Sequence, residues 1–97
     1  MRFVSTRGGG EPLSLSAALS LGLAADGGLF VPEKFPHLAV LPAANQSLAQ
    51  TAAAIIAPFF AGDALQEALP TICADALNFV TPVVATHDPA TQILELF

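Results

Sequence analysis

The sequence predicts an α+β fold made of a short strand–helix–strand unit, a small helical cluster and a C-terminal β-hairpin. In the first third of the chain, short extended apolar runs flank a segment with helical spacing. Alanine-rich segments with helical spacing fill the middle, and two extended runs around an Asp-Pro turn end the chain. We therefore expect one domain over residues 1–80 and a hairpin over residues 81–97.

The strand–helix–strand unit begins with a predicted strand over Met1–Thr6. Ser14 is a candidate N-cap for a helix that ends at Gly22, because its hydroxyl can accept a hydrogen bond from a free N–H group of the first turn. The Asp-Gly-Gly sequence at residues 26–28 is a turn signal, and Leu29–Val31 is the second predicted strand. The connection is long enough for a parallel crossover, so we expect a parallel pair, with an antiparallel pair left open.

The middle of the chain predicts two helical segments. The first spans about 46–61, and Pro58 should kink it or end it one turn early because proline lacks a backbone N–H group. Asp63 is expected to cap the second, with Gln66 in the capping-box position. Pro70 either splits that segment or lies in the first turn of its second part. The expected buried positions are Leu48, Thr51 or Ala52, Ile55, Ile56 and Phe59 in the first segment and Leu65, Leu69, Ile72, Cys73, Ala76 and Leu77 in the second.

The predicted hairpin consists of extended runs over 82–86 and 92–97. In the turn between them Asp88 precedes Pro89, an order that favours a type I turn. The chain stops on Leu-Phe in mid-strand, whereas domain boundaries usually fall in polar or Gly/Pro-rich linkers. We therefore expect an N-terminal piece of a longer protein, with an exposed apolar patch over residues 94–97.

The composition excludes several classes of protein. Hydrophobic residues make up 54% of the chain and charged residues 11%, which excludes intrinsic disorder. The net charge is −5 with three basic residues, so neither nucleic acid nor an anionic membrane is an expected partner. Prolines and polar residues interrupt every long apolar run, so no membrane span is expected.

The expected compartment is the cytoplasm. A single cysteine, Cys73, cannot form an internal disulfide, which fits a reducing environment. The N-terminus does not suit a secretory signal, because Glu11 and a glycine run precede the apolar segment and Leu23 falls where a small side chain is needed.

The chain contains no recognisable catalytic or metal-binding motif. His37, Cys73 and His87 are too scattered to form a metal site. Cys73 lies on an apolar helical stripe with no basic neighbour, which indicates an inert core thiol. The carboxylates are scattered among turns, caps and exposed faces, and no serine lies in a nucleophile elbow. No complete active site is therefore expected.

The strongest candidate site is Ser5-Thr6-Arg7, which a Gly-Gly-Gly run follows at residues 8–10. Hydroxyls, a guanidinium group and free N–H groups after a strand can bind an anion. The spacing matches neither the P-loop nor the dinucleotide-binding motif. A plain connector and a ligand or interdomain role for Arg7 both remain open.

Four segments carry a family resemblance. The opening Arg2–Gly8, which contains Ser5-Thr6-Arg7, the run Leu15–Glu33, which contains Asp-Gly-Gly-Leu-Phe-Val-Pro at 26–32, and the end at Ile93–Phe97 resemble the N-terminal domain of threonine synthase. The middle, from Ile55 through the Gly-Asp pair at 62–63, resembles the family's helix that ends in Gly-Asp.

The resemblance implies an enzyme that makes threonine from O-phospho-L-homoserine and water, releasing phosphate, with pyridoxal phosphate (PLP). The family's PLP-binding lysine belongs to a Phe-Lys-Asp motif that would begin just past Phe97, and Lys34 matches no family lysine. The resemblance thus implies a noncatalytic piece that binds no PLP itself and docks on the PLP-binding domains of the same chain, into which residues 81–97 lead. Ser5, Thr6 and Arg7 become candidates for attracting the substrate phosphate or for a domain interface.

Two alternatives remain open from the sequence. One is a threonine-synthase-like phospho-lyase that eliminates phosphate without making threonine. The other is a free-standing, noncatalytic interaction module that uses the same fold.

Overall fold

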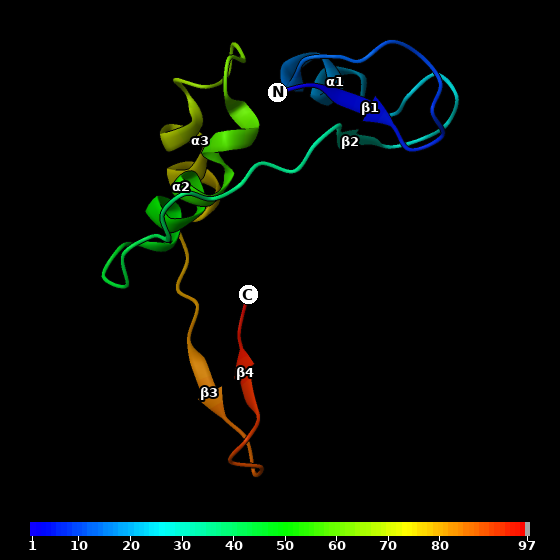
Figure 1. Cartoon of the computed structure of the whole chain (residues 1–97). Helices are drawn as coiled ribbons and strands as arrows, with labels where there is room; N and C mark the ends of the chain where they lie inside the picture. The colour runs from blue at the N-terminus through cyan, green and yellow to red at the C-terminus, as the bar shows by residue number, and fades with distance from the viewer. Residues whose placement is uncertain (97) are drawn as a thin grey trace.

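The computed structural model describes residues 1–96, and Phe97 lies outside the described residues. Figure 1 shows an N-terminal unit, a pair of helices and a projecting hairpin. The α+β class and the C-terminal hairpin are confirmed. The elements in chain order are β1 (Phe3–Ser5), α1 (Leu15–Leu21), β2 (Phe30–Pro32), α2 (Leu48–Phe60), α3 (Leu69–Ala76), β3 (Val83–Ala85) and β4 (Gln92–Leu94).

The strands of the N-terminal unit are antiparallel, with Val4 opposite Val31, so the expected parallel pair is wrong. Helix α1, capped by Ser14 as predicted, ends at Leu21, and the chain turns back two residues later, at Leu23. There Leu23 pairs with Leu29, and the Ala24 N–H donates to the Gly28 carbonyl at 2.9 Å. This tight turn, rather than the helix, sets the direction of β2.

The core of the N-terminal unit joins it to the end of α2. Phe3, Leu15 and Ala18 are buried together, and Phe60 from the last turn of α2 packs against them. The N-terminal ammonium group of Met1 donates a hydrogen bond to the Ala61 carbonyl at 3.0 Å. The N-terminal unit and the end of α2 are therefore held together by the packing of Phe60 and by the hydrogen bond from Met1 to Ala61.

Helix α2 confirms the predicted helix of about 46–61, with ends one or two residues inside that range. It begins after Ser47, whose hydroxyl accepts from the Gln50 N–H while the Gln50 side chain accepts from the Ser47 N–H. It continues through Pro58 to Phe60, so the proline does not end the helix one turn early. No residue of α2 is buried, and Ile55 is exposed, so the expected apolar side is at most half-buried.

The segment after α2 forms turns over residues 63–68, so the expectation that Asp63 caps a helix there is wrong. Its carboxylate instead accepts from the Leu65 N–H and from Ser16 of α1. Helix α3 begins at Leu69 with Pro70 in its first turn, which is one of the two predicted positions. Of the predicted stripe, Leu69 and Cys73 are buried, and the thiol of Cys73 is free.

The hairpin pairs β3 with β4, with Val83 opposite Leu94. Leu94 and Leu96 are more than half exposed, which confirms that part of the predicted apolar patch; Phe97 lies outside the described residues. Over residues 1–96, no helix is both long and apolar enough to cross a membrane.

Candidate functional site

The candidate residues Ser5, Thr6 and Arg7 lie where β1 ends, facing the turn at residues 26–28. Because β1 and β2 are antiparallel and Ser5 pairs with Phe30, the end of β1 meets the turn that precedes β2. The structure thereby brings the Ser-Thr-Arg run and the Asp-Gly-Gly turn, which are about twenty residues apart in sequence, into direct contact.

The centre of this contact is the carboxylate of Asp26. The buried Ser5 hydroxyl donates to it and lies 2.7 and 2.9 Å from its two oxygens. The Gly28 N–H donates to Oδ1 and the Gly9 N–H to Oδ2, both at 2.9 Å. The carboxylate therefore occupies the N–H groups and the hydroxyl that an external anion would need.

Thr6 and Arg7 complete the contact from the strand side. The Thr6 hydroxyl accepts from the Leu29 N–H at 3.0 Å, and the Thr6 N–H donates to the Leu29 carbonyl at 2.9 Å. The Arg7 guanidinium donates through Nη1 to the Asp26 carbonyl at 3.0 Å. The Arg7 N–H donates to the Ser5 hydroxyl at 3.1 Å. We call these contacts among Ser5, Thr6, Arg7 and residues 26–29 the latch.

The glycines of the turn leave room for the latch. A Cβ on Gly28 would collide with the Ser5 hydroxyl and come within 3.0 Å of the Thr6 hydroxyl. Gly27 has a φ of +77°, and a Cβ there would lie 3.1 Å from Nη1 of Arg7. Both positions require glycine, one because of close approach and the other mainly because of its backbone conformation.

The latch stabilises the charged form of Asp26. The hydrogen bond from Ser5, followed by that from the Gly28 N–H, lowers the pKa of this carboxyl below its ordinary value of 3.8. Asp26 is therefore an anion at neutral pH, and a negative charge stands at the centre of the candidate site.

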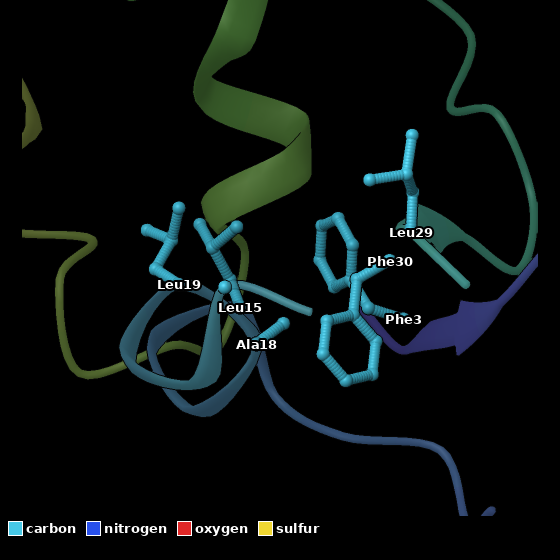
Figure 2. A pocket seen from close by; sticks show the side chains of 7 residues that line it. Phe3, Leu15, Ala18, Leu19, Leu29 and Phe30 are labelled. Atoms are coloured by element: carbon cyan, nitrogen blue, oxygen red, sulfur yellow. The ribbon is translucent and has the colours of Figure 1, made fainter. Parts of the chain in front are cut away.

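Two open grooves flank the latch region. One of about 450 Å³ lies beside the glycine run, and its charged lining residues are Glu11 and Asp26. The other, of about 280 Å³, lies between α1 and β2 and is lined by the apolar residues of Figure 2 together with Gly22. Leu19 and Leu29, at its rim, are 61% and 60% exposed. We call this second groove the apolar groove.

The remaining sequence candidates lie apart from the latch. Lys34 is exposed in the bend after β2, His37 and His87 are exposed, and Cys73 is buried on α3. Within residues 1–96, no three His, Cys, Asp or Glu side chains gather in a way that could hold a metal ion.

Sequence reasoning missed the central residue of the site. The sequence explains Asp26 by turn formation alone, yet its carboxylate accepts hydrogen bonds from Ser5, Gly9 and Gly28. The available signal was an acid inside a glycine-rich turn, in a chain whose first strand ends in hydroxyl and guanidinium groups.

Comparison with known proteins places these features in a family. Residues 2–77 match the family model described as threonine synthase N terminus. Threonine synthases of Pseudomonas aeruginosa and Methylobacillus glycogenes are each 51% identical over 37 residues, which are 38% of this chain and 8% of either relative. No solved structure matches the chain significantly. Since the family model covers most of its length, the chain belongs to the threonine synthase N-terminal family.

Proposed function

We propose that this chain is the noncatalytic N-terminal domain of a cytoplasmic threonine synthase, which converts O-phospho-L-homoserine and water to L-threonine and phosphate. The family match over residues 2–77 supports the proposal. The matched residues are only a small part of each curated relative, so the chemistry is assigned to the remainder of the parent enzyme.

PLP, which supplies the electron sink for such chemistry, is assigned to that remainder as well. A PLP site needs a lysine amine for the Schiff base. Lys34 is exposed in a bend and lies outside both grooves, so the described residues do not fit a PLP site.

The role proposed for this chain is docking on the PLP-binding part of the parent enzyme. The apolar groove is the observation that supports this role. A buried core would cover Leu19 and Leu29, but both side chains are more than half exposed at the rim of the groove. Large apolar side chains gathered around an open groove are typical of an interaction surface.

For Ser5, Thr6 and Arg7 the geometry favours the domain interface over substrate-phosphate binding. The Asp26 carboxylate already occupies the Ser5 hydroxyl and the Gly9 N–H. The neighbouring groove adds the acid Glu11. The carboxylates of Asp26 and Glu11 would repel a phosphate dianion electrostatically. A rigid latch instead suits a preorganised surface that keeps its shape when it docks.

The test is a chimera in which this chain replaces the corresponding N-terminal segment of the Pseudomonas aeruginosa threonine synthase. We expect it to restore growth of a threonine auxotroph and, when purified with PLP, to make threonine and phosphate in equal amounts. The matched control is the same enzyme with the segment deleted, which should be inactive or insoluble.

The alternatives predict different results. A phospho-lyase parent would be indicated if the full polypeptide that carries this segment released phosphate without threonine. A chimera that folds, binds PLP and still makes no threonine would contradict the proposal.

A further inference from the structure

The hairpin β3–β4 lies outside the part of the chain that the family model describes. That match ends at residue 77, and the hairpin strands begin at Val83. Figure 1 shows the hairpin pointing away from α2 and α3. The radius of gyration, 16.7 Å, exceeds the roughly 13 Å of a compact chain of this length, as expected for a projecting element. Within residues 1–96, β3 and β4 therefore pair only with each other and join no other strand.

Apolar side chains occupy both faces of the hairpin. Val83 and Leu94 are opposite one another and share one face with Leu96, and they are 58%, 54% and 63% exposed. Val84 and Ile93 share the other face, where Ile93 is 52% exposed. A hairpin with one solvated face would alternate apolar and polar residues, whereas strands covered on both faces are mainly apolar. Within β3 and β4 the single polar residue is Gln92, on the face of Leu94.

Both outer edges of the hairpin offer unpaired backbone groups. The Glu95 N–H donates to the Pro82 carbonyl at 3.0 Å, so this pair faces inward. By the alternation of an antiparallel ladder, Val84 and Ile93 also face inward. The N–H and C=O groups of Val83 and Ala85 on one edge, and of Gln92 and Leu94 on the other, therefore point outward.

Neither outer edge has the features that protect an edge strand. Exposed edges are normally blocked by lysine, an outward-facing proline or a bulge. Residues 83–85 and 92–94 include no charged residue and no proline, and they pair without a bulge. A two-stranded hairpin of this kind is at best marginally stable alone in water.

We propose that β3 and β4 become interior strands of a larger sheet by adding to strands of the PLP-binding part of the parent polypeptide, with both faces covered there. This rests on the function proposed above. Two observations indicate the PLP-binding part as the partner of the hairpin. The hairpin lies beyond the N-terminal family match, and the relatives extend far beyond the segment that they share with this chain.

The direct test compares amide hydrogen exchange in the 97-residue chain and in the full polypeptide. In the short chain the outward amides of Val83, Ala85, Gln92 and Leu94 should exchange nearly without protection. In the full polypeptide they should slow by about 100-fold or more, as interior strand amides do. Outward amides that exchange equally fast in both proteins would overturn the proposal.

Substitutions provide a second measurement. Ile93→Lys and Leu94→Lys place a charge on opposite faces, and Leu41→Lys is the control at an exposed leucine of the connector. In the 97-residue chain all three should leave Tm nearly unchanged. In the full polypeptide the two hairpin variants should lower Tm and the control should not. Equal behaviour of all three variants would contradict burial of both faces.

These outcomes are separable from the function proposed above. If the full polypeptide makes no threonine but the outward amides become protected, the proposed function fails and the strand addition stands. If it makes threonine and those amides still exchange freely, the strand addition alone is wrong.

Discussion

The carboxylate of Asp63 accepts hydrogen bonds from both the N–H and the hydroxyl of Ser16, at 3.0 and 3.1 Å, across 47 residues of sequence. Ser16 lies in the first turn of α1, where the N–H groups lack partners within the helix. No acidic residue of α1 itself lies in that turn, so an acid from the loop after α2 serves the helix N-terminus. This contact ties the N-terminal unit to the helical pair.

The substitution Asp63→Asn should lower Tm at neutral pH and make little difference in acid. The hydrogen bond from the Ser16 N–H, followed by that from the Leu65 N–H, lowers the pKa of Asp63 below 3.8. A lowered folded pKa gives stability that is present above pH 3.8 and is lost as the pH falls through the folded value. Thermal melts of both proteins from pH 7 to pH 2 should therefore converge below pH 3.8.

Asp75→Asn is the matched control for that experiment, because Asp75 is an exposed acid on α3. It should leave Tm nearly unchanged across the same pH range. A Tm difference for Asp63→Asn that stays constant down to pH 2 would show that the charge of Asp63 is not the cause.

Removal of the Ser5 hydroxyl should weaken the latch. Ser5→Ala leaves the Asp26 carboxylate with one donor fewer and the Arg7 N–H without its acceptor. We expect a loss of about 1 kcal/mol or more in the free energy of unfolding, measured by urea denaturation. Ser20→Ala, at an exposed position of α1, is the control and should be nearly neutral. Equal effects would mean that the latch adds no stability.

Arg7→Ala separates docking from phosphate binding in the full polypeptide. A docking role predicts a larger loss of Tm in the full polypeptide than in the 97-residue chain, where only the contact of Arg7 with the Asp26 carbonyl is lost, and a nearly unchanged KM for O-phospho-L-homoserine. Phosphate binding predicts a KM raised about tenfold or more, with the same change in Tm in both proteins, because a guanidinium–phosphate contact is strong and specific. Steady-state kinetics and melting on the same samples decide between them. Unchanged values in both would contradict either role for Arg7.

Local sequence signals predicted where helices and strands lie better than they predicted the contacts between these elements. Ser14 and Pro70 lie where helix-start chemistry placed them, since a cap or a first-turn proline depends on neighbouring residues only. The direction of β2 depends on the tight turn after Leu23, which helix and strand periodicity does not encode. Asp63 was assigned to the nearest helix in sequence, whereas its partner Ser16 is close only in space.

The candidate site shows the same limit. Ser5, Thr6 and Arg7 were found because they carry donors and acceptors in a recognisable run. Their partner Asp26 was explained adequately by its own turn, so no local signal linked it to Ser5. The contact exists because antiparallel pairing brings the end of β1 to the turn before β2.

The N-terminus of α2 offers a test of local capping. Ser47 and Gln50 form a reciprocal capping box. Ser47→Ala should cost about 1 kcal/mol in the free energy of unfolding, whereas Ser47→Gly should cost only about a few tenths of a kcal/mol, because glycine suits the N-cap position better than alanine. Urea denaturation of the two variants measures the difference. A larger loss for glycine than for alanine would contradict the capping assignment.

Two leucines of α1 distinguish the buried core of the chain from the proposed docking surface. Leu15 is buried against Phe3 and Ala18, so Leu15→Ala should cost about 2–5 kcal/mol in the 97-residue chain. Leu19 is 61% exposed at the rim of the apolar groove, so Leu19→Ala should stay within about 0.5 kcal/mol. If the proposed docking covers Leu19 in the full polypeptide, Leu19→Ala should lower Tm there as well. If Leu19→Ala is neutral in both proteins, the apolar groove is not a docking surface.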